Sequence, residues 1–390
     1  MKYSVLIISI CVLVFETICS CGKQEKRIRD SSRQLICNID SSFLIENLSE
    51  LCDSVSFIPL ETHNNSIVGV IDKIVVDTTN IYILSNNNLY IYNKRGGLDF
   101  KISQKGHAKN EYMEINDFCI SHGSIYIADT QAKKILVFSK SGTYDRTIAT
   151  PTFPEFIESI SDSLLAISCS GLEGYRLTML DTRDGHTKQG YFQYDKRFSS
   201  PIPQTFVRTD NNQILYKQPF SNLYYRIMND GNIEEMYRVN FGDYTFQESD
   251  IGEINFGGSK IPYDTKGNAG ILRFNESTAF FQIEFTCERL AKDAQFIALI
   301  SKKNNKSYLI NSDNYKDDLA FYNFRILPDF SYLFNGCLWG IIYPASWKDD
   351  VNKLKTIEKY QQYGRILEYV NSISDEQNPI VCIYHIKKSL

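Results

Sequence analysis

Residues 70–150 contain one pattern of short strands written twice, and this repeat constrains the fold more than any other feature of the chain. The first copy spans residues 71–96 and the second spans residues 115–142, and in each copy turn residues separate three β-branched or aromatic runs. Ile81 and Ile125, at equivalent places in the two copies, are 44 residues apart. A repeat of this length is typical of a propeller blade, which needs a neighbour on each side to bury its two faces.

Weaker copies of the pattern continue along the chain. Residues 164–185, 206–231, 280–310 and 329–343 keep the order of strands and turns, with hairpin residues such as Asp-Gly and Asn-Asn between the runs. The Gly-rich stretch 241–275 is expected to be a long loop between two blades. At about 45–50 residues per blade, the strand-rich part predicts an all-β fold, a six-bladed β-propeller, with seven blades as the alternative.

The apolar period changes to that of a helix near the C-terminus. Val351, Leu354 and Ile357 begin a series at helical spacing, which predicts a helix over about 346–373. Pro379 then introduces a final strand, which is expected to pair with a blade begun near the N-terminus and so remove open sheet edges. The sequence thus predicts a single β-propeller domain over residues 51–390, with a C-terminal helix before the closing strand.

The N-terminus has the features of a secretory signal. A basic start precedes an apolar run from Val5 to Phe15, which is too short to span a bilayer. Ile18-Cys19-Ser20-Cys21 resembles a bacterial lipobox, and the resemblance implies cleavage before Cys21 and its lipidation. An ordinary signal peptide cut nearby, or a signal anchor, is the alternative. We therefore expect a signal peptide over 1–20, a lipidated Cys and tether over 21–50, and an exported protein anchored in the envelope, in the outer membrane, with the leaflet open.

Charge, histidine and cysteine usage narrow the function classes. The net charge of −4, without a basic stripe, argues against nucleic-acid binding. The five His residues are scattered without ligand spacing, so neither a metal nor another cofactor is expected. The predicted mature chain has seven Cys besides Cys21, an odd number, and no Cys-x-x-Cys. Buried thiols are expected, with one disulfide as an alternative in an exported protein, and the chain is expected to be a monomer.

Several short segments, in their order, resemble one family. Together with the lipobox they are similar to the six-bladed β-propeller lipoproteins common in Bacteroidota; the segments are Phe57-Ile-Pro-Leu-Glu-Thr62, the link from Gly106 to Tyr112, Ile125-Tyr-Ile-Ala-Asp129 and Asn378-Pro-Ile-Val-Cys382. The link departs from the family's usual Gly-x-Gly-Pro-Gly-Glu-Tyr because Ala108, Lys109 and Asn110 replace Gly, Pro and Gly. The resemblance implies a fold and a location, and no biochemical activity.

The link between the first two copies contains the candidate ligand-binding residues. Glu111 and Tyr112 precede the first strand of the second copy, where they could face a central channel, and Lys109 offers a cation nearby. A phenol ring beside carboxylate and ammonium groups suits polar ligands such as sugars. The alternative, which we favour, is that these residues satisfy backbone groups in a tight link. Glu61 is likewise interpreted as a solvated strand end rather than as a channel acid. Asp129 is interpreted as a turn residue rather than as a catalytic one.

Two classes of function remain from the sequence. It contains no Gly-x-Ser-x-Gly, His-Glu-x-x-His or P-loop motif, so no catalytic residues are assigned and an enzyme is the less favoured class. The favoured class is a non-catalytic binding or scaffold module of the cell envelope that presents its channel to a glycan, a peptide or a protein partner. The alternative is a propeller hydrolase or lyase with carboxylate and Tyr chemistry in the channel.

Overall fold

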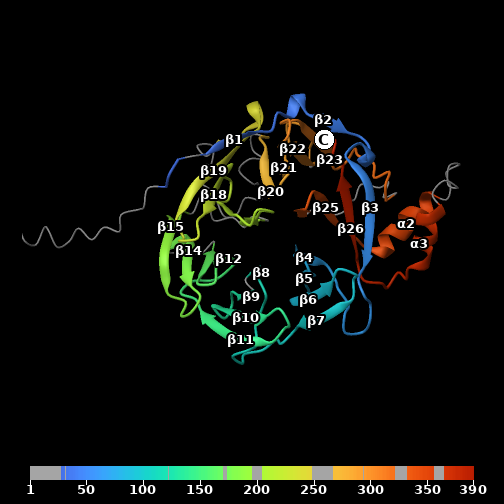
Figure 1. Cartoon of the computed structure of the whole chain (residues 1–390). Coiled ribbons are helices and arrows are strands. Elements are labelled where there is room, and N and C mark those ends of the chain that lie inside the picture. Colours follow the sequence, from blue (N-terminus) through green and yellow to red (C-terminus); the bar gives the residue numbers. More distant parts are fainter. Residues whose placement is uncertain are drawn as a thin grey trace, which may run out of the picture.

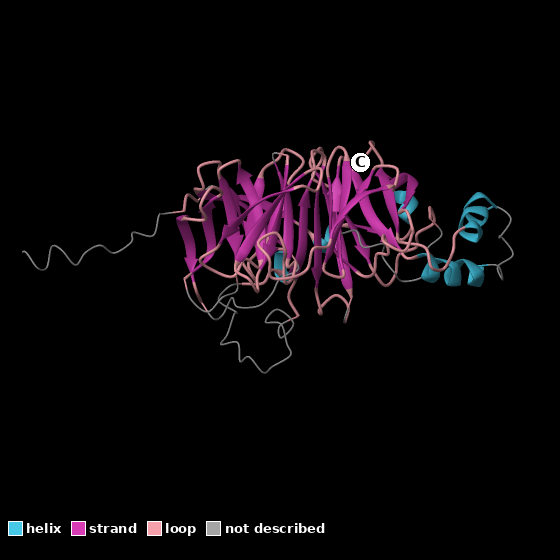
Figure 2. Ribbon diagram, turned by 90° about the horizontal axis from the view of Figure 1, so that it is seen from below, coloured by secondary structure: helices cyan, strands magenta, loops and turns pink. Residues whose placement is uncertain are grey.

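The protein forms a closed ring of six sheets, each with four antiparallel core strands, around a central axis (Figure 1). The computed structural model describes residues 28–30, 32–121, 123–169, 174–195, 204–247, 267–292, 294–320, 332–354 and 364–390. Seen from the side, the strands run roughly parallel to one another across the thickness of the ring (Figure 2). The all-β class and the six blades predicted from the repeat are confirmed.

Blades 1 to 3 each contain four strands that follow one another in the sheet as they do in the chain, with the first strand innermost. They consist of β4 (Ile71–Val76), β5 (Asn80–Ser85), β6 (Asn88–Asn93) and β7 (Leu98–Ile102); β8 (Asp117–Ser121), β9 (Ser124–Asp129), β10 (Lys134–Ser139) and β11 (Tyr144–Ala149); and β12 (Phe156–Ser161), β13 (Leu164–Ser168), β14 (Tyr175–Asp181) and β15 (Thr187–Gln193). The middle strands, such as β5 and β9, are buried at nearly every position because both faces of a blade pack on its neighbours.

Blades 4 and 5 have the same four-strand core. Their strands are β16 (Phe206–Arg208), β17 (Ile214–Lys217), β18 (Leu223–Ile227) and β19 (Ile233–Asn240), and β20 (Gly270–Glu276), β21 (Phe280–Thr286), β22 (Gln295–Ser301) and β23 (Ser307–Asn311). Strand β20 lies partly inside the stretch 241–275 that the sequence suggested was a loop. The glycines in that stretch led to the prediction of a loop, although the strand's apolar residues, such as Ile271 and Phe274, are buried in the core.

Blades 4 and 5 each gain a fifth, outermost strand from the N-terminal segment. Strand β1 (Arg33–Ile36) pairs in parallel with β19, and β2 (Phe43–Ile45) pairs in parallel with β23. This differs from the expectation that residues 21–50 are only a tether, because the segment satisfies the backbone groups of two otherwise open sheet edges. Cys21, the predicted lipidation site, lies outside the described residues.

Blade 6 closes the ring with strands from both ends of the chain. Its order is β24 (Tyr332–Phe334), β25 (Cys337–Ile342), β26 (Ile380–Ile386) and β3 (Cys52–Pro59), so the C-terminal strand lies between β25 and the N-terminal β3. The expected closing strand is therefore present. Among the described residues, no helix is both long and apolar enough to cross a membrane.

Two helices lie on the outside of blade 6, beside β3 (Figures 1 and 2). They are α2 (Pro344–Leu354) and α3 (Gly364–Ser372). The sequence predicted one helix over 346–373; α3 begins at Gly364, and residues 355–363 lie outside the described part. The indole of Trp347 is fully buried, with its ring centroid 5.3 Å from that of Phe57 and 6.0 Å from that of Tyr369. This aromatic cluster attaches the helices to the outer strand of blade 6.

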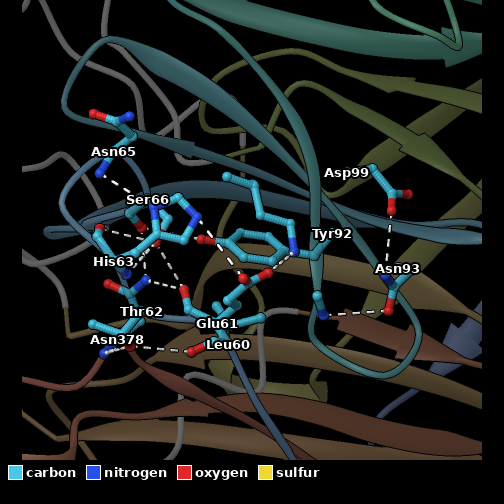
Figure 3. Close-up of polar contacts among 12 residues, drawn as sticks. Leu60, Glu61, Thr62, His63, Asn65, Ser66, Tyr92, Asn93, Asp99 and Asn378 are labelled. Carbon is cyan, nitrogen blue, oxygen red and sulfur yellow. Dashed lines mark hydrogen bonds and ion pairs between the residues drawn. The ribbon is translucent and has the colours of Figure 1, made fainter.

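A group of hydrogen bonds around the buried Asn378 fixes the start of β26 to the segment that follows β3 (Figure 3). We call these residues, Asn378, Glu61, Thr62, Ser66 and Val68, the closure cluster. The Asn378 amide nitrogen donates to the carbonyl oxygens of Glu61 (2.7 Å) and Ser66 (2.6 Å), and its amide oxygen accepts from the Val68 N–H (2.8 Å). The Asn378 N–H donates to Thr62 Oγ1 at 2.8 Å. Two of the segments that resembled the family pattern thus meet in space.

The closure cluster also contacts blade 1. The Tyr92 hydroxyl donates to the carbonyl oxygen of Ser66 at 3.2 Å, and the Glu61 carboxylate accepts from the Leu98 N–H at 2.8 Å (Figure 3). The Glu61 N–H donates to the carbonyl of Gly96 at 2.8 Å. Gly96 has φ +87°, and a Cβ there would lie 2.0 Å from the Pro59 carbonyl oxygen, so this close approach requires glycine. These contacts join the closing blade to the first one.

Candidate functional site

The innermost strands surround a cavity of about 490 Å³, which we call the central cavity. Its walls come from β4, β8, β12, β16, β20 and the end of β25, so five blades and the closing blade all contribute. The volume lies within the range of about 300–1,000 Å³ usual for small-molecule sites. The lining combines charged, amide and aromatic side chains, among them Lys73, Asp117, Glu158, Gln204, Arg208, Arg273, Asn275, Phe118, Phe206 and Tyr343.

Lys73 and Asp117 form an ion pair between blades 1 and 2. Lys73 Nζ lies 2.6 Å from Asp117 Oδ1, donates to the carbonyl of Phe118 at 2.8 Å and lies 5.2 Å from the centre of that ring. The second carboxylate oxygen of Asp117 accepts from the Ile157 N–H at 2.9 Å. Burial lowers the pKa of Lys73, but the Asp117 carboxylate outweighs it and holds that pKa above its ordinary value. The ammonium group therefore stays charged.

Glu158 and Arg208 form a second ion pair, between blades 3 and 4. Arg208 Nη2 lies 2.6 Å from Glu158 Oε1 and also donates to the carbonyl of Ser159 at 2.6 Å, while Nη1 donates to Asn212 Oδ1 at 2.5 Å. The guanidinium group is thus held at several points. A planar group held in this way loses little conformational entropy when a ligand binds to it.

Blade 5 contributes a third pair and, together with Gln204 before β16, an amide network. Arg273 Nη1 contacts both carboxylate oxygens of Glu284, at 3.1 and 3.0 Å, directly across β20 and β21. The Gln204 side chain accepts from the Phe274 N–H at 2.7 Å, and its amide nitrogen lies 3.4 Å from Asn275 Oδ1. Amide groups of this kind offer donors and acceptors side by side, as hydroxyl-rich ligands require.

In all three pairs the cation is more exposed than the carboxylate. The exposed fractions of the side chains are 34% against 6% for Lys73 and Asp117, 25% against 10% for Arg208 and Glu158, and 29% against 9% for Arg273 and Glu284. The carboxylates therefore lie behind the cations and orient them. Burial raises the pKa of Asp117, but both of its oxygens already accept hydrogen bonds. This arrangement positions donors for a ligand better than it supplies a carboxylate for proton transfer.

The candidate residues of the link after blade 1 lie elsewhere. Tyr112 is fully buried, and its hydroxyl donates to the carbonyls of Asn87 and Ile102. The Glu111 carboxylate accepts from the Ala108 N–H at 2.9 Å, within the link itself. None of Lys109, Glu111 and Tyr112 lines the central cavity. These contacts are those expected of residues that stabilise the link, and ligand binding by them stays a prediction.

Glu61 and Asp129 both accept hydrogen bonds from backbone N–H groups, which agrees with the turn expected at Asp129 and goes beyond the solvated strand end expected at Glu61. Glu61 belongs to the closure cluster and does not line the central cavity. Asp129 accepts from the N–H groups of Met113 (2.8 Å) and Ala132 (3.1 Å), which fixes the turn after β9. Among the described residues, no three His, Cys, Asp or Glu side chains are grouped so that they could hold a metal ion.

Sequence reasoning missed the residues of the central cavity. Lys73 and Asp117 are 44 residues apart, as far apart as the two copies of the repeat, and Glu158 and Arg208 are separated by 50. Each lies in the first strand of its blade, among apolar neighbours. A search for polar residues in the first strand of every copy would have found them, since that strand lines the channel of a propeller.

The comparisons with known proteins agree with this fold. The model of the family described as "Domain of unknown function (DUF4934)" matches residues 38–385. A Bacteroides fragilis protein described as exported is 16% identical, with a TM-score of 0.70 over 91% of this chain and 100% of that chain. A member of the DUF4221 family from Bacteroides vulgatus is 9% identical, with a TM-score of 0.51 over 86% of this chain and 97% of that chain. The comparison with curated proteins found no match. Identities this low show the fold alone.

Proposed function

This chain belongs to the DUF4934 family, and we propose that it is a non-catalytic binding module of the cell envelope whose central cavity holds a small polar ligand of the glycan type. The observation that carries the proposal is the lining of the cavity. Three cations, oriented by buried carboxylates, lie together with amide groups and the rings of Phe118 and Phe206. Sugars are bound by such planar polar groups together with apolar ring faces.

A hydrolase or lyase is the second candidate. The two carboxylates paired with cavity cations speak against it, and the group it would have to use is Asp72, an exposed carboxyl in the lining whose pKa burial raises. Acid–base chemistry needs a carboxyl group that can reach the ligand and exchange a proton with it. Asp117 and Glu158 are instead buried counter-ions, with exposed fractions of 6% and 10%. Their described contacts favour a role in positioning Lys73 and Arg208.

The envelope location and the lipid anchor belong to the same proposal. They are supported by the signal sequence, by the lipobox ending at Cys21 and by a structurally similar Bacteroides protein described as exported. A labelled fatty acid should enter the wild-type chain and not the Cys21→Ser variant, which should also leave the membrane fraction. Equal labelling of the two chains would contradict the anchor.

The binding proposal is tested by presenting the purified protein to glycan and peptide arrays and measuring each hit by titration calorimetry. The proposal expects a glycan hit with a measurable dissociation constant. If no glycan binds at millimolar concentration while peptides bind, the ligand class is wrong. If neither class binds, the binding module itself is refuted.

A double variant tests whether the ligand binds in the central cavity. Glu158→Gln combined with Arg208→Gln removes both charges together, so neither charge is left without its counter-ion. Loss of a charge-assisted hydrogen bond to the ligand costs about 1.5–3 kcal/mol, so binding should weaken roughly 10- to 100-fold. The matched control replaces Arg238 and Glu235, a 3.3 Å pair on β19, with Gln and should bind as the wild type does. Unchanged binding by the first variant would exclude the cavity.

Ligand binding at Lys109, Glu111 and Tyr112 stays open as a second site. Glu111→Gln separates the alternatives, because a ligand-binding carboxylate can be lost without loss of stability. Weaker ligand binding with an unchanged melting temperature would support a site in the link. A lower melting temperature with unchanged binding would show that Glu111 stabilises the link through the Ala108 N–H.

A further inference from the structure

The predicted mature chain has one accessible thiol. The seven cysteines after Cys21 all lie in the described part of the structure, and all are thiols without a disulfide partner. Six are buried, and Cys337 alone is partly exposed. Because none of the seven is in a disulfide, exposure decides which of them can react with a molecule in solution. The structure indicates which cysteine this is.

Cys337 lies in a row of three side chains on one face of blade 6. It begins β25 and is directly paired with His385 of β26. Its sulfur lies 3.4 Å from His385 Nδ1, and His385 Nε2 lies 3.0 Å from Ser56 Oγ on β3. When Nε2–H donates to Ser56, Nδ1 is free to accept the thiol proton. This is the order of nucleophile, base and orienting group that activates a thiol.

The surroundings of the thiol suit an anionic reaction partner. Cys337 and His385 both line a second cavity, of about 780 Å³, which lies apart from the central cavity. Its lining includes four lysines and one acidic residue, Asp53; the lysines are Lys302, Lys303, Lys387 and Lys388. Lys302 is paired with Glu276 at 2.6 Å, so the other three lysines supply most of the positive charge. A basic lining attracts negatively charged molecules.

The Cys337 sulfur is protonated at neutral pH, so it needs a base before it can react. Burial, together with the negative charge of Asp210, raises the pKa of Cys337 above its ordinary value. The group is therefore a thiol and not a thiolate at neutral pH. Since only the thiolate attacks a disulfide, the proton must be taken up by a neighbour as the reaction begins, and His385 is in contact with the sulfur.

We propose that Cys337 is a reactive thiol that exchanges with small anionic disulfides, with His385 as its base and Ser56 as the residue that positions the imidazole. The S–H bond of Cys337 breaks and its proton moves to His385 Nδ1. The sulfur forms a bond to one sulfur of the disulfide while the original S–S bond breaks. The leaving thiolate takes the proton from His385, so the products are a mixed disulfide at Cys337 and one free thiol.

The experiment measures the rate of modification of the full-length protein by 3,3′-dithiodipropionate, with the modified cysteine located by peptide mass mapping. Cys337 should react first, and the six buried cysteines should stay unmodified in the folded protein. His385→Gln should slow the reaction at least about tenfold, since a positioned base contributes roughly 10²–10⁴. Ser56→Ala should slow it less, and Ser56→Thr should restore it.

Charge and folding are controlled separately. The neutral reagent 2-hydroxyethyl disulfide should react more slowly with the wild type. Lys387→Gln with Lys388→Gln should reduce the difference between the reagents, since Lys303 remains in the lining. Melting curves establish that each variant is folded; if His385→Gln is not, the Ser56 variants decide. Modification spread over several cysteines, or an unreactive Cys337, would overturn the proposal. If His385→Gln is folded and reacts at the wild-type rate, the role of the base is overturned. If His385→Gln does not fold, a wild-type rate in Ser56→Ala overturns it.

Discussion

Asn378→Ala should destabilise the whole propeller, because this one side chain joins three separate backbone groups at the point of ring closure. It leaves the Val68 N–H and the carbonyl oxygens of Glu61 and Ser66 without their partner, in a place where Asn378 itself is only 2% exposed. A buried polar group left without a hydrogen bond costs about 1–3 kcal/mol. At the lower end for each of three groups, the free energy of unfolding should fall by about 3 kcal/mol.

Urea unfolding, followed by circular dichroism, measures this loss. The midpoint should move to lower urea while the slope stays unchanged, which is the sign of lost stability without a change in the unfolding reaction. Asn378→Asp should be at least as harmful, because it keeps the acceptor for Val68 but sets a second oxygen against two carbonyl oxygens. Asn304→Ala is the control: Asn304 is exposed, its amide nitrogen donates to a main-chain oxygen of Leu390 at 3.0 Å, and its amide oxygen accepts from the Lys306 N–H at 2.9 Å.

The control should lose no more than about 0.5 kcal/mol, as is usual for surface positions. A loss of that size in Asn378→Ala would refute the reasoning, since it would mean that the ring closes without the closure cluster. A large loss in both variants would show that the method is reporting a general effect of replacing Asn with Ala.

Three further predictions concern stability. Burial raises the pKa of Asp317 to about 6, above its unfolded value, so the folded state binds this proton more tightly and stability should fall as pH rises from about 4 to 6. Asp317→Asn should remove a difference of about 2 kcal/mol between urea unfolding at pH 4 and pH 7; an unchanged difference would refute this. Gly96→Ala should cost more than Gly123→Ala, because both glycines have positive φ but only at Gly96 would a Cβ meet backbone, and equal melting temperatures would contradict this. Trp347→Ala should lower stability by about 3–5 kcal/mol in the same urea assay, because the indole is fully buried between Phe57 and Tyr369, and a loss under 1 kcal/mol would mean that the helices are not packed as described.

The ring could be predicted from the sequence because a blade repeats its own pattern of strands and turns. The copies at 71–96 and 115–142 are blades 1 and 2, and the closing strand after Pro379 lies where the need to remove open edges placed it. Strands β1 and β2 could not be predicted in this way. They contain four and three residues, carry no turn signal, and are ordered by the edges of blades 4 and 5 rather than by their own sequence.

The central cavity could not be predicted for a different reason. Lys73 and Asp117 meet because blades 1 and 2 are neighbours, and the chain between them contains nothing that marks the pair. Reasoning from the link chose Glu111 and Tyr112 because polar and aromatic residues stood together there, yet the fold uses Tyr112 as a buried hydrogen-bond donor. Proximity in sequence indicated the structural residues, whereas the cavity is assembled from residues that are far apart.

The crystal structure of the protein with the tightest-binding glycan from the array is the most direct test of the central claim. The account predicts ligand density in the central cavity, with hydrogen bonds from Lys73, Arg208 or Arg273 and contact with Phe118 or Phe206. Density bound on the link at Lys109 and Glu111, or on the outer surface of the blades, with the central cavity holding only water, would contradict it.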